Sequence, residues 1–173
     1  REKIFVPITL GGGIRNVGHA KQCFDNGADK ILINYLAHFD SDGCKKISNI
    51  YGEQAISIMV DYKKEQNEIN TYINSGTTFS KSLKDFIIST KKIKFGELIM
   101  NSIDKDGTAA GPDLDCLKTI SEDFTNPILI MGGAGKPEHF SNILNNKKVS
   151  GIITANLFNF LGSGLEEARN YSI

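Results

Sequence analysis

The chain has 173 residues, 40% of them hydrophobic and 23% charged, which is the composition of one ordinary globular domain. Twenty basic residues balance twenty acidic ones, so no overall field attracts nucleic acid or an anionic membrane. No apolar run approaches the roughly 18 residues of a membrane span, and no signal peptide is visible. Three cysteines without paired spacing fit a reducing compartment. We therefore expect a cytoplasmic protein with neither a nucleic acid nor a membrane as partner.

Apolar runs along the chain predict six buried strands, at Ile4–Leu10, Asp29–Ile33, Gln54–Val60, Glu97–Ile103, Ile128–Met131 and Gly151–Ala155. Helical patterns follow them, at Val17–Asn26, Asp42–Tyr51, Ser82–Lys92, Leu114–Ser121, Pro137–Asn145 and Gly164–Asn170. Residues 68–73 alternate in polarity and predict a hairpin with the run near Thr78. This alternation of strands and helices is typical of an α/β fold with a parallel sheet, either open or closed into a barrel.

One strand–turn–helix–strand unit occurs twice. Residues 7–13 and 127–135 each begin with proline, continue as an apolar strand and end in a run rich in glycine. Each is followed by a helical pattern and a further strand that ends at an asparagine, Asn34 or Asn156. Glycine turns before helices commonly bind phosphate. The repeat favours a closed barrel with two phosphate sites on opposite sides of a pseudo-twofold axis.

Small or polar residues follow every predicted strand, at the edge where ligands gather in parallel α/β folds. They are Gly11–Gly13, Asn34-Tyr35, Asp61, Asn101-Ser102 with the loop 104–108, Gly132-Gly133 and Asn156.

Asp61 is the candidate general base, because a carboxylate at the end of a buried strand is partly desolvated. Its alternative role is a structural pair with a nearby lysine such as Lys63. The Asp106-Gly107 dipeptide is likewise either part of a binding site or only a turn.

The histidines His19, His38 and His139 lie on helical patterns with no second ligand four residues on, so we expect no metal site. Cys23 and Cys116 are expected to be buried as small apolar side chains. No cofactor is expected.

Four motifs together resemble the cyclase subunit (HisF) of imidazole glycerol phosphate synthase, from histidine biosynthesis. They lie at residues 6–14, 27–34, 102–108 and 132–136 of a similarity that runs from Ile4 to about Phe160. The resemblance implies a (β/α)8 TIM barrel and a lyase that needs no metal. It also implies a HisH-like glutaminase partner, whose ammonia passes through the barrel to a substrate with two phosphates. The products would be imidazole glycerol phosphate and an aminoimidazole carboxamide ribonucleotide.

Carried over by motif, Asp61 matches a catalytic aspartate of that family. The residues that match its phosphate and substrate contacts are Gly12, Gly13, Asn34, Asn101, Ser102, Asp106, Gly107, Gly132, Gly133 and Asn156. Lys30 and Glu97 match charged residues on the face where ammonia enters.

Two departures separate the chain from that family. The family's first two strands and helices, which carry its other catalytic aspartate, have no counterpart in this chain. We therefore expect residues 1–173 to form one partial barrel domain equivalent to strands 3–8, inactive alone, from a truncated or cleaved chain or one given only in part. Tyr35, Asn101 and Asn156 replace small hydroxyl residues, which is similar to a paralogous branch that amidates a sugar for lipopolysaccharide or another surface glycan.

Three functions thus remain open at the level of sequence. The first is the ammonia-using enzyme of this family, on its histidine or sugar branch. The second is a non-catalytic half-barrel that binds phosphate, and the third is an unrelated phosphosugar isomerase on a similar barrel.

Overall fold

The computed structural model describes residues 5–155 and residue 170. Six strands of its sheet lie in the order β1-β2-β3-β6-β7-β8, which is their order in the chain. Every pairing along this path is parallel. The prediction of parallel neighbours in chain order is confirmed, and the arrangement is that of a partial (β/α) barrel rather than an open doubly wound sheet.

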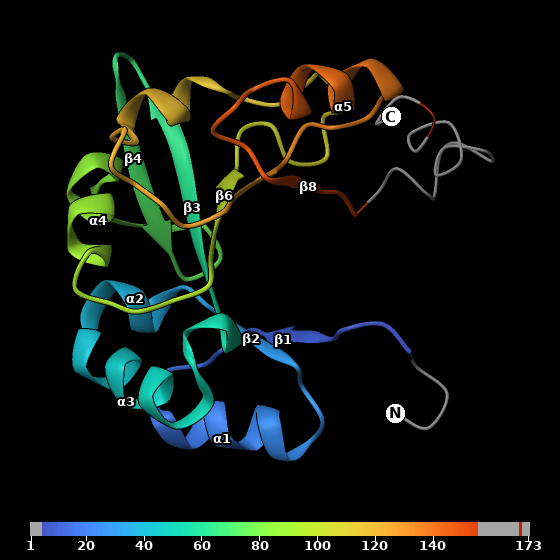
Figure 1. The fold of residues 1–173 in the computed structure, drawn as a ribbon. Helices are drawn as coiled ribbons and strands as arrows, with labels where there is room; N and C mark the ends of the chain where they lie inside the picture. The colour runs from blue at the N-terminus through green and yellow to red at the C-terminus, as the bar shows by residue number, and fades with distance from the viewer. Residues whose placement is uncertain (1–4, 156–169, 171–173) are drawn as a thin grey trace.

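The six parallel strands are β1 (Thr9–Gly11), β2 (Lys30–Ile33), β3 (Ile56–Glu65), β6 (Glu97–Ser102), β7 (Ile128–Met131) and β8 (Gly151–Ile153). The helices are α1 (Val17–Asp25), α2 (Tyr35–Phe39), α3 (Ser41–Tyr51), α4 (Leu83–Thr90) and α5 (Pro137–Leu144). Two 3-10 helices are η1 (Glu53–Ala55) and η2 (Asp115–Thr119), and the hairpin strands are β4 (Glu68–Ile73) and β5 (Thr78–Ser82). Figure 1 shows α1 to α4 on one side of the sheet, with β1 and β8 at its opposite ends.

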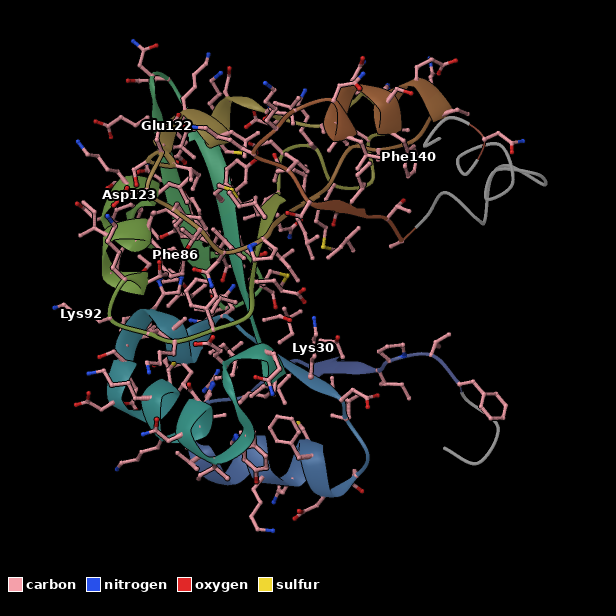
Figure 2. All side chains as sticks on the ribbon, in the orientation of Figure 1. Lys30, Phe86, Lys92, Glu122, Asp123 and Phe140 are labelled. Carbon is pink, nitrogen blue, oxygen red and sulfur yellow. The ribbon has the colours of Figure 1, made fainter. Side chains whose placement is uncertain are left out.

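Alternation along the strands separates an outer, apolar face from an inner, more polar one. On β3, Ile56, Ile58 and Val60 are fully buried and belong to the core that the helices cover. Phe86 of α4 is also fully buried in this core, while Lys30 projects from β2 away from the helices (Figure 2). The inner face of the sheet therefore carries the polar side chains, and packing of the outer face against the helices keeps the strands that carry them in place.

The central strand β3 is longer than predicted. It does not end at Val60 but continues through Asp61 to Glu65. The reason is the hairpin, because β4 pairs antiparallel with β3 from Asp61 opposite Tyr72 to Glu65 opposite Glu68. The predicted hairpin is thus confirmed, and it extends the sheet beyond the edge where the other strands end.

The helix predicted at 114–121 is wrong, because η2 is a 3-10 helix. Side chains in and just before it bind neighbouring backbone groups. The Thr119 hydroxyl donates to the carbonyl of Cys116, and the Cys116 thiol donates to that of Asp113, each three residues back. The Asp113 carboxylate also accepts from the N–H of Asp115.

Other differences are smaller. The short helix α2 was not predicted, β1 begins only at Thr9, and β8 ends at Ile153. Cys116 is buried as predicted, whereas Cys23, also predicted to be buried, is only half-buried. Cys44, for which no prediction was made, is buried. The predictions for Asn156 and for most of the last helix fall outside the described residues.

Candidate active site

Asp61 lies on the inner face between two asparagines from the neighbouring strands. Asn34, at the end of β2, donates from Nδ2 to Asp61 Oδ2 at 2.8 Å. Asn101 of β6 donates from Nδ2 to Asp61 Oδ1 at 2.7 Å. The carboxylate is thus fixed through both oxygens, and no lysine of residues 5–155 pairs with it. Lys63 instead places its ammonium 4.7 Å from the centre of the Tyr72 ring.

Burial raises the pKa of Asp61, and this effect outweighs the hydrogen bonds from Asn101 and Asn34, which lower it. The charge of Asp106 raises it further. The side chain is only 8% exposed. A carboxylate with a raised pKa and no cationic partner is a better proton acceptor than an ordinary surface aspartate.

Asp61 borders two hollows on the carboxyl side of the sheet. The first, of about 300 Å³, is also lined by Gly12, Gly13 and Asn34. The second, of about 310 Å³, is also lined by Asn101 and Asp106. The structure therefore brings together residues from both halves of the predicted site around one carboxylate.

Other predicted site residues line neither hollow. The Ser102 side chain is 3% exposed, on the opposite face of β6 from Asn101. Gly107, Gly132 and Gly133 border neither of these two spaces. Asn156 lies outside the described residues, so its role remains a prediction.

The two glycine turns lie at the same edge of the sheet but in different surroundings. Gly12 and Gly13 have φ of 96° and 71°, and a Cβ on either would meet nothing within 4 Å. A Cβ on Gly132 would lie 2.7 Å from the carbonyl oxygen of Ser102, and one on Gly133 would collide with that of Gly111. The first turn is open to a ligand, whereas the second is packed under the loop that follows β6.

The histidine after each glycine turn has the same structural role. His19 Nδ1 lies 3.1 Å from the carbonyl oxygen of Gly13 and 3.4 Å from the backbone nitrogen of Arg15, and His139 Nδ1 accepts from the N–H of Gly135 at 3.1 Å. Each histidine thus ties its turn to the first turn of the following helix, which extends the internal repeat to the hydrogen bonds. Within residues 5–155 and 170, no cluster of three metal-ligating side chains occurs.

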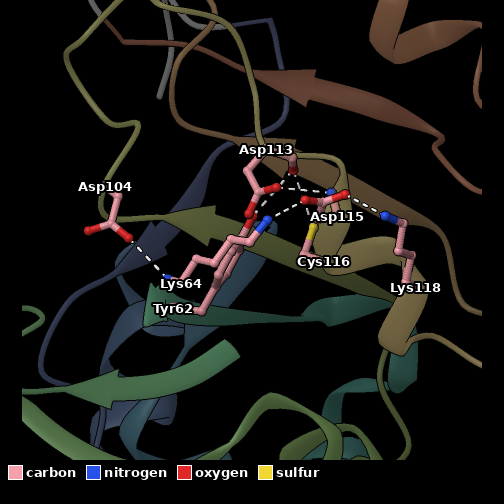
Figure 3. Close-up of polar contacts among 7 residues, drawn as sticks. All are labelled: Tyr62, Lys64, Asp104, Asp113, Asp115, Cys116 and Lys118. Carbon is pink, nitrogen blue, oxygen red and sulfur yellow. Dashed lines mark hydrogen bonds and ion pairs between the residues drawn. The ribbon is translucent and has the colours of Figure 1, made fainter. Parts of the chain in front are cut away.

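The loop that carries Asp106 is tied to β3 outside the hollows (Figure 3). The Asp104 carboxylate accepts from the N–H of Lys64 at 3.0 Å. The Lys64 ammonium forms an ion pair with Asp115, which also binds Lys118. The buried Tyr62 hydroxyl donates to the carbonyl of Asp113 at 3.3 Å. These contacts hold the loop and η2 against the extension of β3.

The opposite edge of the same three strands carries a second acidic group. Lys30, the first residue of β2, forms a 2.9 Å ion pair with Glu97, the first residue of β6. Between them, on β3, Ser57 donates to Glu97 at 2.5 Å. Burial acts to raise the pKa of Glu97, but the hydrogen bonds from Ser57 and Lys30 outweigh it, so the pKa lies below its ordinary value.

Sequence reasoning missed several residues at the hollows. Asn74 and Ser75, at the tip of the hairpin, line the first, and Ser75 and Gly76 line the second. The length of the alternating run 68–73 was the available signal. A strand of six residues that returns along the extension of β3 reaches back to the level of Asp61, so the turn that follows it lies close to Asp61. Arg15 and Tyr35 also line the first hollow, with the guanidinium carbon 4.9 Å from the ring centre.

Comparisons with known proteins agree with this geometry. The histidine biosynthesis protein family matches residues 1–162. A provisionally named imidazole glycerol phosphate synthase subunit hisF2 of Parasynechococcus marenigrum is 36% identical over 97% of this chain. Imidazole glycerol phosphate synthase subunit HisF of Clostridium botulinum (strain 657 / Type Ba4) is 33% identical over 98% of it, and that of Leptospira biflexa 33% over 96%.

The chain spans 63% of the hisF2 relative and 68% and 67% of the other two. No helix in the described part of the chain is long and apolar enough to cross a membrane. The family match, the parallel strands in chain order and the polar inner face agree with one another. The chain therefore belongs to the histidine biosynthesis protein family, in the branch of the imidazole glycerol phosphate synthase cyclase subunit.

Proposed function

We propose that the protein carrying this sequence is the cyclase subunit of an imidazole glycerol phosphate synthase-like enzyme. It takes ammonia from a HisH-like glutaminase and forms imidazole glycerol phosphate from a substrate with two phosphates. In this proposal residues 1–173 are one partial barrel domain that corresponds to strands 3–8 of the family's eight. The observation that carries it is the position of Asp61, clamped by two asparagines between two hollows.

The chemistry assigned to Asp61 is proton acceptance. When ammonia adds to an electrophilic carbon, its nitrogen becomes cationic and must lose a proton before the ring closes. The Asp61 carboxylate accepts that proton, and Asn34 and Asn101 hold it in place. Gly12 and Gly13 offer an open turn for one phosphate, and Asp106 and Gly107 belong to the loop beside the other.

The ammonia path is proposed to begin at Lys30 and Glu97, because the inner face leads from this ion pair to Asp61 along β3. Co-purification with the glutaminase encoded beside the gene tests this docking face. A charge-reversed Lys30→Glu variant should associate less than the unchanged protein, and a surface variant, Lys21→Glu on α1, is the matched control.

A sugar-amidating enzyme is the second candidate, and Tyr35 favours it. This side chain lines the first hollow beside Gly12 and Gly13, where the family has a small hydroxyl residue. Its ring lies under the guanidinium of Arg15 and 4.8 Å from the ring centre of Phe39. The Tyr35 ring thus takes up space beside the first glycine turn that a phosphate would use, and it offers an aromatic surface against which a sugar ring can pack.

The decisive experiment supplies the complete gene product with ammonium salt and the bis-phosphate substrate of histidine biosynthesis. Formation of imidazole glycerol phosphate supports the first function. A full-length protein that is folded but makes none, and that instead amidates a sugar, establishes the second. Absence of both reactions would leave the non-catalytic phosphate-binding role and the phosphosugar isomerase.

A further inference from the structure

Among the residues that the structure describes, two line both hollows at the carboxyl edge. One is Asp61 on β3, and the other is Ser75, at the tip of the β4–β5 hairpin. A ligand that fills both spaces therefore passes by Asp61 and Ser75 together. Asp61 has its role in the proposed function, whereas nothing so far has assigned one to Ser75.

The hairpin tip has an unusual backbone. Asn74, Ser75 and Gly76 have φ of 52°, 57° and 76°, so three successive residues lie in the left-handed region. Glycine adopts this region freely, but serine does so at an energetic penalty. Strained residues of this kind cluster at ligand sites, where the surrounding structure holds them.

The strained tip is held from two sides. The Thr77 hydroxyl donates to the carbonyl of Asn74 at 2.7 Å, and the N–H of Thr77 donates to the carbonyl of Ile73 at 3.2 Å. Gly76 is packed so closely on Ile103 that an added Cβ would lie 2.9 Å from its Cδ1 atom. Ile103 immediately precedes the loop with Asp106, so the tip and that loop are fixed relative to each other.

The Ser75 side chain is exposed, and its hydroxyl has no hydrogen-bond partner within the described residues. A hydroxyl can donate and accept, so it can bind the polar middle of a substrate whose ends occupy the two hollows. This property complements Asp61, which can only accept while it is ionised.

We propose that Ser75 is a substrate-binding residue that contacts the part of a two-anion substrate lying between the hollows, opposite Asp61. The proposal rests on the proposed function and adds the hairpin tip to its site. The ligand class is a polyhydroxylated chain or ring with an anionic group at each end.

The test uses Ser75→Gly in the complete gene product. This change removes the hydroxyl and relieves the backbone strain, so the fold should be unharmed or more stable. The matched control is Gln66→Gly, which relieves the same strain (φ 54°) at the other turn of β4, away from both hollows. Thermal unfolding verifies that both variants fold.

Binding is measured by calorimetry with fructose 1,6-bisphosphate, which carries two phosphates, and with inorganic phosphate, which fills one hollow at a time. We expect Ser75→Gly to weaken the bisphosphate about tenfold, the effect of one lost hydrogen bond to a charged or polar ligand, and to leave inorganic phosphate unchanged. Gln66→Gly should change neither.

The outcomes separate the two proposals. If Ser75→Gly binds the bisphosphate as tightly as the unchanged protein does, the role of Ser75 is overturned and the proposed function stands. If the unchanged protein does not bind the bisphosphate, the two-anion ligand class and the role of Ser75 are overturned, and the assay with ammonium salt decides the proposed function separately. If both probes weaken equally, Ser75 serves one hollow only and does not bridge them.

Discussion

Strands β2, β3 and β6 carry a polar cluster at each end, and the two clusters shift the pKa of their carboxyl groups in opposite directions. At the amino edge Glu97 bonds a cation and a hydroxyl, Lys30 and Ser57. At the carboxyl edge Asp61 bonds only two neutral amides. Accordingly the pKa of Glu97 lies below its ordinary value and that of Asp61 above it.

The two clusters also differ in which of their polar atoms lack a hydrogen-bond partner. The two Glu97 oxygens are bonded separately, one to Lys30 and one to Ser57. At the other end the amide oxygens of Asn34 and Asn101 are buried without a partner. Leaving buried acceptors unpaired is destabilising, so the cluster at the carboxyl edge is less well satisfied than the one around Glu97. The same strands thus carry an ion pair at one end and, at the other, the carboxylate that we propose as the base.

The largest effect is expected from Asp61→Asn. The change keeps the shape and removes the base, so turnover with ammonium salt should fall at least about 100-fold. Steady-state kinetics of the complete gene product, alongside circular dichroism to verify the fold, measure it. Near-normal turnover would mean that the carboxylate is structural, like Glu97, and the contrast between the two ends would collapse.

A smaller effect is expected at the amino edge, on stability rather than chemistry. Glu97→Gln removes the charge that Lys30 and Ser57 bind. It should lower the free energy of unfolding by about 1–2 kcal/mol, more than an exposed ion pair contributes, because the Glu97 side chain is mostly buried. Urea unfolding measures this change. Asp25→Asn, which breaks the exposed Lys21–Asp25 pair on α1, is the control and should have less effect.

The pH dependence of stability should have opposite signs in these variants. Asp61 holds its proton more tightly when folded, so its contribution is fully present below the ordinary pKa of 3.8 and is lost as pH rises through the raised value. Glu97 contributes above its ordinary pKa of 4.5, and the contribution is lost as pH falls through the lowered value.

Unfolding of both variants should therefore be compared with the unchanged protein between about pH 3.5 and pH 7. As pH rises, Asp61→Asn should gain stability relative to the unchanged protein, and Glu97→Gln should lose it. Parallel curves for the two variants would contradict the assignment of opposite pKa shifts.

The smallest effect is expected outside both clusters. Asp115→Asn weakens the exposed ion pairs with Lys64 and Lys118, and such pairs contribute little. The unfolding midpoint and turnover should both be unchanged within the precision of calorimetry and kinetics. A clear loss of turnover would show that the ties in Figure 3 position the Asp106 loop for catalysis.

Much of the fold was predictable from the sequence, because its signals are local. Apolar runs such as Ile128–Met131 indicate strands inside a sheet with one face in the core. The two repeated units, each running from a proline through a strand to a glycine turn and a helix, indicate that the strands are parallel. The error at 114–121 arose because hydrophobic periodicity does not report local bonds between side chains and backbone. Here the Cys116 and Thr119 side chains donate to carbonyls three residues back, and the Asp113 carboxylate accepts from the N–H of Asp115.

The candidate site was predicted only in part. The sequence by itself determined that Asp61, the asparagines and the first glycine turn meet at one edge, because parallel strands in chain order put their carboxyl ends together. Only the tertiary structure decided that Asn34 and Asn101 clamp Asp61, that the second glycine turn is packed against Ser102, and that Ser75 reaches the site. These facts depend on strand register and on the return of a hairpin, and contacts between residues 14 to 40 positions apart leave no periodic trace in the sequence.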